Sequence, residues 1–447
     1  MQMNVKTYHI TCCALFACML LSQWFCFGVV LLSWWFQLGN IVLTKIMLDS
    51  PSNEGVKRRL ERKYYEHSGV SILKPLCGAP VTLYENLRTY FTLQYPVFEL
   101  IFCVADEDDP ALEVVKKLQE EFPEVSTIVS TGTKDVGVNP KVCNLATGYD
   151  AANWDLVWIA DANIVASDAA LQDMVDKCVS GSRLVHQLPW TVSGPAVEAT
   201  LGAISCGSIL ERWYFASAHG RPYTVLNHAV CTCLNGMSNL FSKHHMDAIG
   251  GLEQFGTTLN EDAEIGLAFD QHGYTTSISK HVAVQNIGPI GICDYVDRRV
   301  RWTQLRNKYT KTRWTAPFEV IVDSHVASLM CLSLLVYCHG VGSPVLLTMH
   351  QGLWLLCDCI VFMLMDRAIA LPISWQEFRL DWGRVTKTNR GFYFYMLNMV
   401  QHYAMWWSRE FITMYIRLNA LRNTEQIVWK DQELPLPENS EEDTKSD

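Results

Sequence analysis

The chain has 447 residues and a formal net charge of −10, of which the last seventeen residues carry −6. Charged residues make up only 18% of the chain and hydrophobic residues 49%. This composition excludes a disordered protein and a basic nucleic-acid-binding module, and it argues against a purely soluble protein. The length allows for two or three domains.

The first 45 residues indicate an uncleaved membrane anchor. Residues 7–44 contain no Asp, Glu, Lys or Arg, and roughly 20 apolar residues in a helix are enough to cross a bilayer. We therefore expect a transmembrane helix at about 13–35. Because positive flanking charge favours the cytosolic side, the bulk of the chain is expected in the cytosol. Only Lys6 precedes the span, whereas the basic residues that follow it are Lys45, Lys57, Arg58, Arg59, Arg62 and Lys63.

Residues 46–320 have the pattern of an α/β domain. A helix is predicted from Pro110, where apolar residues recur at helical spacing, and another over 140–152. Alternating strands and helices predict a mostly parallel sheet covered by helices, and ligands of such sheets bind beyond the carboxyl ends of the strands. The short apolar runs that predict strands are 70–76, 99–105, 126–130, 156–160 and 184–188.

A second membrane region is predicted over residues 321–430. The stretch from Ser324 through Cys357 is uncharged and is broken at Gly340–Pro344, which indicates two short helices at about 325–340 and 344–365. A third uncharged and aromatic stretch, Phe392–Ser408, is compatible with a span, a re-entrant segment or a helix lying flat on the membrane. Residues 431–447 form an acidic tail.

Carboxylates follow two of the predicted strands. The strand at 99–105 leads into Asp106–Asp109, and the strand at 156–160 leads into Asp161. A metal-bound diphosphate fits this edge of the sheet, because Mg²⁺ commonly takes one or two carboxylates plus phosphate oxygens. Two structural interpretations stay open here: Asp109 as a helix cap before Pro110, and Asp161 as an ordinary turn residue.

Two further motifs follow along the chain. Glu261 and Asp262 precede a helix predicted over 263–271, where a helix cap is again the structural alternative. Arg298 and Arg301 are three residues apart and share a helix face, followed by Trp302. They belong to a basic stretch, 298–313, that can alternatively anchor the chain on anionic lipid.

The ordered set of Asp109, Asp161, Asp262 and Arg298-x-x-Arg301-Trp302 resembles the pattern of inverting membrane glycosyltransferases. More narrowly, it is similar to the ceramide glucosyltransferase family. The segments that carry this resemblance are Ser71–Leu76, Cys103–Pro110, Gly137–Lys141, Leu184–Pro189, Asn235–Ser238 and Arg301–Arg306.

The resemblance implies a GT-A-type domain that faces the cytosol from a Golgi membrane and transfers glucose from UDP-glucose to the primary hydroxyl of ceramide, with inversion. It implies that Asp262 is the general base and that Asp161 holds a divalent cation, Mg²⁺ or Mn²⁺, on the diphosphate. Asp109 would bind the nucleotide and Lys141 a phosphate. Arg298, Arg301 and Trp302 would clamp the diphosphate and the acceptor side. His219 matches a family histidine near the acceptor, and a purely structural histidine is the alternative.

Two other functions compete with this expectation. One is a different inverting membrane glycosyltransferase, such as a polysaccharide synthase, which would need more membrane helices than the three or four expected here. The other is a catalytically silent membrane module of the same fold. The presence of all the expected acidic and basic residues argues against the second.

Overall fold

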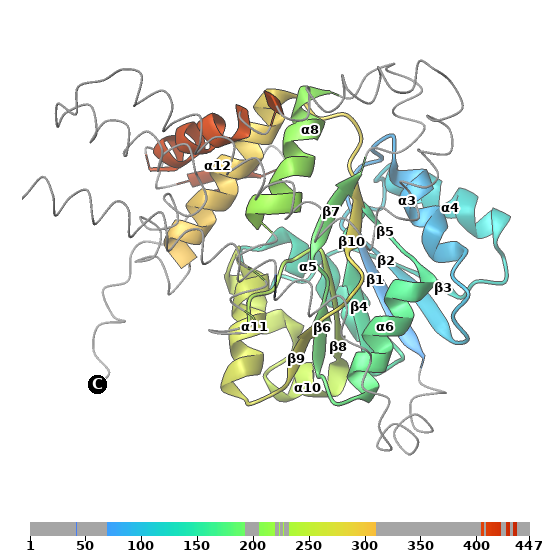
Figure 1. Ribbon diagram of the computed structural model, residues 1–447. Helices are drawn as coiled ribbons and strands as arrows, with labels where there is room; N and C mark the ends of the chain where they lie inside the picture. The colour runs from blue at the N-terminus through green and yellow to red at the C-terminus, as the bar shows by residue number, and fades with distance from the viewer. Residues whose placement is uncertain are drawn as a thin grey trace, which may run out of the picture.

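A seven-stranded mixed sheet forms the centre of the protein in this computed structural model (Figure 1). The structure describes residues 69–192, 205–219, 232–309 and 408–421, the strands Gln426–Trp429 (β11) and Gln432–Pro435 (β12), and a few single residues. In order across the sheet, the strands are β3 (Thr127–Thr131), β2 (Phe98–Val104), β1 (Val70–Leu76), β4 (Leu156–Ala160), β8 (Ser238–Ser242), β6 (Leu184–His186) and β9 (Thr276–Ile278).

The sheet is mostly parallel, as the sequence predicts. Strands β1 to β4 run parallel, with Val70 aligned to both Phe98 and Leu156. Strand β8 is antiparallel to both of its neighbours, β4 and β6. A smaller sheet joins β5 (Ile164–Val165), β10 (Ala283–Asn286) and β7 (Pro189–Val192).

Both faces of the large sheet are covered because its central strands are apolar on both sides, as expected for a parallel sheet between helices. Alternate residues of one strand enter different cores: Trp158 packs on one face, and Val157 and Ile159 on the other. Figure 1 shows α3 and α4 to the right of the sheet, α11 to its left and α10 below it. The first face is covered by α3 (Leu83–Phe91), α4 (Ala111–Glu121) and α6 (Asp168–Val179), and the second by α5 (Pro140–Asp150), α10 (Lys243–Ala248), the 3₁₀ helix η2 (Leu252–Thr257) and α11 (Glu261–Gln271).

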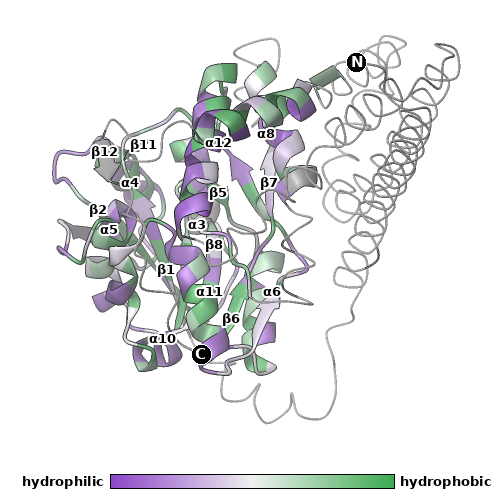
Figure 2. Cartoon of the chain, turned by 90° about the vertical axis from the view of Figure 1, so that its left-hand side faces the viewer, coloured by the Kyte–Doolittle hydropathy of each residue, from purple (hydrophilic) through white to green (hydrophobic). Residues whose placement is uncertain are grey.

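A separate helical group lies at one end of the molecule. It contains α8 (Cys206–Trp213), the π-helix η1 (Tyr214–His219), α12 (Ile292–Tyr309) and the helix over 408–421. Leu210, Tyr295 and Ile416 form its buried centre. Hydrophobic and hydrophilic stripes lie side by side on α12 (Figure 2), so this helix presents different faces to its neighbours.

The predicted elements agree with the structure to within a few residues. The strands at 70–76 and 156–160 are confirmed without change, and the strands predicted at 99–105 and 126–130 are each displaced by one residue. Helix α11 begins at Glu261, two residues before its predicted start. The strand predicted over 184–188 ends at His186, so its last two residues were wrong.

The predicted membrane segments lie almost entirely outside the described residues. This holds for the spans at 13–35, 325–340 and 344–365 and for most of 392–408. Among the helices that the structure does describe, none is long and apolar enough to cross a bilayer. The domain boundaries after residues 45, 320 and 430 stay predictions.

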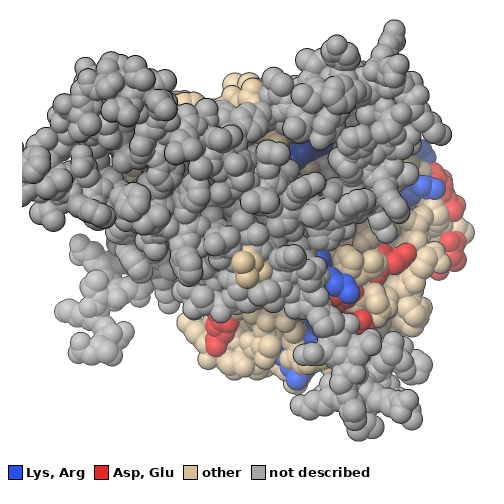
Figure 3. Space-filling model, in the orientation of Figure 1, with Lys and Arg blue, Asp and Glu red and all other residues tan. Residues whose placement is uncertain are grey.

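On the described part of the surface visible in Figure 3, acidic and basic side chains are interspersed.

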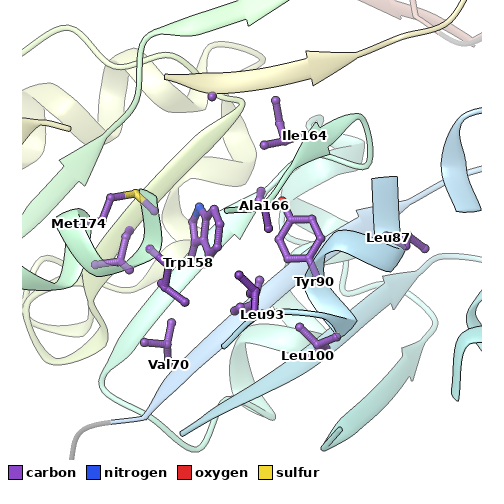
Figure 4. Packing of buried hydrophobic residues seen from close by; sticks show 14 of the residues in the cluster. Val70, Leu87, Tyr90, Leu93, Leu100, Trp158, Ile164, Ala166 and Met174 are labelled. Atoms are coloured by element: carbon purple, nitrogen blue, oxygen red, sulfur yellow. The ribbon is translucent and has the colours of Figure 1, made fainter. Parts of the chain in front are cut away.

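Trp158 is the largest side chain in the core on the α3 side. It is 1% exposed, its ring lies 5.5 Å from that of Tyr90, and its indole N–H donates to Ser238 Oγ at 2.9 Å (Figure 4). Trp158 therefore fills the core and also ties β4 to β8.

We expect Trp158→Ala to lower the free energy of unfolding by about 3–5 kcal/mol, because it leaves a cavity and removes the indole N–H that donates to Ser238 Oγ. Thermal unfolding in detergent measures this change. The matched control is Val81→Ala, at a side chain that is 85% exposed. Equal melting temperatures for the two variants would contradict the role assigned to Trp158.

Candidate active site

Asp109 is held by backbone N–H groups just beyond the carboxyl end of β2. Its two carboxylate oxygens accept from Gly78 N at 3.0 and 2.9 Å, and Oδ1 also accepts from Ala111 N at 2.8 Å. The carboxylate therefore fixes the start of α4 to the loop that follows β1. The N-cap residue of α4 is Pro110, so Asp109 is not the cap itself, but it accepts from the first N–H of the helix. The same contacts hold the carboxylate at the edge of the sheet, where ligands of such sheets bind.

Lys141 joins carboxylates that come from different elements. Its amino group lies 2.9 Å from Asp161 Oδ1, beyond β4, and 3.4 Å from Glu261 Oε1, at the start of α11. It also donates to the carbonyl oxygen of Gly236. Burial opposes the charge on Lys141, but Asp161 and Glu261 outweigh it and raise the pKa of the amine. The amine is therefore a firmly charged group at the centre of the site.

Gly236 lies against three charged side chains of this site. A Cβ atom there would lie 3.4 Å from both Glu261 Oε1 and Lys141 Nζ, and 3.5 Å from Asp262 Oδ2. The backbone of Gly236 thus faces Lys141, Glu261 and Asp262 together. We call Lys141, Asp161, Glu261 and Asp262 the acidic cluster.

Asp262 is the carboxylate with the most perturbed protonation. Burial raises the pKa of Asp262 to about 7, the neighbouring charge of Glu261 adds to this effect, and the Ala263 N–H and Lys141 oppose it. Oδ1 accepts from Ala263 N at 2.8 Å. A carboxylate with a pKa near neutrality is suited to proton transfer, because it can take up and release a proton at the working pH.

Lys74 supports Asp161 from inside the sheet and was not predicted as a site residue. This lysine of β1 is fully buried, donates to the main-chain oxygen of Asp161 at 2.6 Å and lies 3.9 Å above the ring of Tyr90. Burial lowers its pKa well below the usual value, against the opposing charge of Asp161. Its sequence signal was a single lysine within an apolar strand.

The arginine motif lies on α12, as predicted, and faces α8. Arg298 Nη1 donates to Glu211 Oε1 at 2.8 Å, and its guanidinium lies 5.0 Å from the ring of Trp302. Burial lowers the pKa of Arg298, whereas Glu211 and Asp161 are among the charges that raise it. Asp161 therefore acts electrostatically on the α12 motif. Burial, together with Arg298 and Arg299, lowers the pKa of Arg301 to about 10.

His219 lies in an aromatic cluster next to this motif. Its ring stacks on Tyr223 at 4.5 Å and lies 6.0 Å from Trp302. Burial, followed by the charges of three arginines, lowers its pKa well below 6.5, so the imidazole is neutral. The charge of Asp262 is among the causes that raise the pKa of Tyr223. Tyr223 thus contacts His219 and lies within the electrostatic range of Asp262 in the acidic cluster.

Most of the predicted site residues come together in one region. Lys141, Asp161 and Asp262 share the acidic cluster, whereas Arg298, Trp302 and His219 form its aromatic and basic side. Asp109 lies two strands away from the end of β4, at the end of β2. Lys74 and Glu211 were not predicted as functional residues. Glu261 and Arg299 lie within the predicted motifs, but no role was predicted for either of them.

One carboxylate suits a cation that is completed by phosphate oxygens. The Asp161 side chain is 31% exposed and lies beside the positive charge of Lys141. Within the described residues, no group of three or more His, Cys, Asp or Glu side chains is placed to hold a metal ion. Asp161 therefore fits a cation held mainly by a bound diphosphate, which is the usual way that Mg²⁺ is bound beside phosphate.

The family model of glycosyl transferase family 21 matches residues 32–441. The chain belongs to glycosyl transferase family 21. Ceramide glucosyltransferase 3 of Caenorhabditis elegans is 32% identical over 331 residues, covering 73% of this chain and 70% of that protein. Ceramide glucosyltransferase 1 of the same organism is 35% identical over 240 residues, covering 53% of this chain and 50% of that protein. The resemblance to ceramide glucosyltransferases is thereby confirmed.

A solved structure also resembles this chain. The mannosyltransferase PcManGT of Pyrobaculum calidifontis, in complex with GDP-Man and Mn²⁺, is 15% identical and superimposes with a TM-score of 0.47. The superposition covers 79% of this chain and 99% of that one.

We expect glycosyl transfer by this chain to increase with pH and to level off above pH 7, because a base with a pKa of about 7 is protonated below that value. Lys141→Met should move this acidic limb to higher pH, since the positive charge that opposes protonation of Asp262 is lost. The measurement is kcat/KM against pH.

The control is Lys134→Met, which removes an exposed lysine that pairs with Asp150 and Glu253 outside the cluster. Its pH profile should match that of the wild type. A Lys141→Met profile that also matches the wild type would show that Asp262 is not the titrating group.

Proposed function

We propose that this chain transfers glucose from UDP-glucose to the primary hydroxyl of ceramide, with inversion, giving glucosylceramide. The observation that carries the proposal is the acidic cluster, where the half-buried carboxylate of Asp262, with its raised pKa, lies with Lys141 and the half-buried Asp161. Membership of glycosyl transferase family 21 and the ceramide glucosyltransferases among the relatives support the donor and the acceptor.

The donor would bind along the carboxyl ends of β2 and β4, on a domain of the GT-A type. Asp109 would contact the nucleotide, and Lys141 a phosphate oxygen. Asp161 would hold a divalent cation, Mg²⁺ or Mn²⁺, which when bound neutralises the charge that builds on the departing diphosphate. Arg298 and Arg301 would add guanidinium contacts to the phosphates, because their planar N–H pairs match phosphate oxygens.

Asp262 would act as the general base. It takes the proton of the ceramide hydroxyl while the oxygen attacks the anomeric carbon from the face opposite UDP. The new carbon–oxygen bond forms, the bond to the diphosphate breaks, and UDP leaves with the bonding electrons. Inversion at the anomeric carbon follows from this single displacement. Trp302 and neutral His219 would line the acceptor side, where an uncharged surface suits a lipid alcohol.

We further propose that the catalytic domain is held at the cytosolic face of a Golgi membrane. Ceramide leaves a bilayer at a cost of about 0.8 kcal/mol for each exposed methylene, so the site has to come to the lipid. The charges that flank residues 13–35 support the cytosolic side, and the family resemblance supports the Golgi. A face of the helix over 408–421 supports membrane contact, with exposed apolar side chains at Phe411, Tyr415, Leu418 and Leu421. We call these residues the apolar stripe.

The proposed reaction is tested with microsomes, UDP-[¹⁴C]glucose and a fluorescent ceramide. The wild type should give a labelled glycolipid, and Asp262→Asn should lose at least ~100-fold in rate, the usual contribution of a general base, while UDP-glucose still binds. A labelled polymer would indicate a polysaccharide synthase, and the absence of any product a silent module. Retained turnover by Asp262→Asn would remove this residue as the base.

The apolar stripe is tested with Leu418→Glu. We expect kcat/KM for long-chain ceramide in vesicles to fall by roughly tenfold, because a charge at this position opposes contact with lipid. The value for a short-chain, water-dispersed ceramide should change little. Val129→Glu is the control, at an exposed residue of edge strand β3. An equal loss on both substrates would assign the stripe to folding.

A further inference from the structure

Glu211 is a buried carboxylate shared by two arginines. Its Oε1 accepts from Arg298 Nη1 at 2.8 Å and from Arg299 Nη2 at 2.6 Å. The Glu211 side chain is fully buried, Arg299 is 3% exposed and Arg298 is 22% exposed. The three side chains lie between α8 and α12. No role was predicted for Glu211, and Arg299 was only one of the unspecified positions between Arg298 and Arg301.

Arg299 is enclosed by aromatic rings. Its guanidinium carbon lies 3.9 Å from the ring centre of Tyr214, 4.0 Å from Trp302 and 5.0 Å from Phe215. Rings at this distance attract a cation and hold its plane in place. Arg299 thus fixes Trp302 of the motif against the π-helix that carries His219.

The charges in this group do not cancel. One carboxylate serves two guanidinium groups, so one positive charge remains. Nearby, Arg409 and Glu410 form a buried ion pair of their own. Arg299 is buried against Glu211 and the aromatic rings. Arg298 is more exposed, and the negative charge of Asp161 raises its pKa. The remaining charge therefore falls on Arg298, on the side of the acidic cluster.

We propose that Glu211 and Arg299 are positioning residues for Arg298. Glu211 orients the Arg298 guanidinium, and Arg299 neutralises Glu211, so that Arg298 keeps an uncompensated positive charge for the diphosphate of a nucleotide. This inference rests on the proposed function, since it takes the diphosphate as the ligand of Arg298. It also gives a reason for the buried Arg299 on α12, which lies between Arg298 and Arg301.

The test measures the affinity of the purified full-length chain for UDP in the presence of Mn²⁺, by titration calorimetry. In Arg299→Met, Glu211 pairs with Arg298 alone and neutralises it. We expect the Kd for UDP to rise roughly tenfold, which corresponds to about 1.4 kcal/mol. Arg299→Lys keeps the charge and should retain most of the affinity.

A double variant separates positioning from folding. Glu211→Gln alone leaves Arg299 buried without its carboxylate, so both the melting temperature and the UDP affinity should fall. Glu211→Gln combined with Arg299→Met removes both buried charges and leaves Arg298 positive. It should therefore bind UDP more tightly than Arg299→Met alone and melt at a higher temperature than Glu211→Gln alone.

Unchanged UDP affinity in Arg299→Met, with only a lower melting temperature, would overturn the inference in favour of a purely structural pair. Equal UDP affinity of Arg299→Met and the double variant would overturn it as well. A wild type that binds UDP but makes no glucosylceramide would remove the proposed reaction and leave this inference to be decided by the affinities. A wild type without UDP binding would overturn both.

Discussion

The candidate site depends on the ion pairs of Lys141. Asp161, Glu261 and Asp262 come from two different elements, and three carboxylates brought together would repel one another and resist ionisation. The buried amine lies 2.9 Å from Asp161 and 3.4 Å from Glu261, which offsets that repulsion. Asp262 receives less of this compensation, because burial and the charge of Glu261 dominate its surroundings. One lysine thus compensates Asp161 and Glu261 more than Asp262, whose raised pKa suits it to take up a proton.

The antiparallel strand β8 is what closes this cluster. Because β8 runs against β4, it begins where β4 ends, with Ser238 aligned to Ala160. The residues just before β8 therefore lie at the same edge as Asp161, whose N–H donates to the oxygen of Met237 at 2.9 Å. Gly236 then faces Lys141 and Asp262. A parallel strand in this place would begin at the opposite edge of the sheet and leave the site without this wall.

The sequence predicted what depends on local pattern and missed what depends on tertiary contact. Apolar runs such as 156–160 identify central strands, because buried strands need apolar side chains on both faces. Asp161 and Asp262 followed from their positions beside strands and helices and from the family resemblance. Glu211 and Arg299 have no such signal, since each takes its role only when α8 packs on α12. Strand β8 was not predicted at all, and its direction could not follow from composition, because strand direction is set by connections.

Helix α12 reconciles the two interpretations of the basic stretch at 298–313. Arg298 and Arg299 turn inward to Glu211, and Trp302 lies in the same cluster, so the first half of the stretch belongs to the site. In the proposed function, the basic residues beyond Arg306 contact anionic lipid, since they are close in sequence to the predicted membrane region. Helix α12 would then connect the lipid surface to the diphosphate site. A displacement of α12 relative to α8 would change the position of the Arg298 guanidinium, because Arg298 donates to the buried carboxylate of Glu211 on α8.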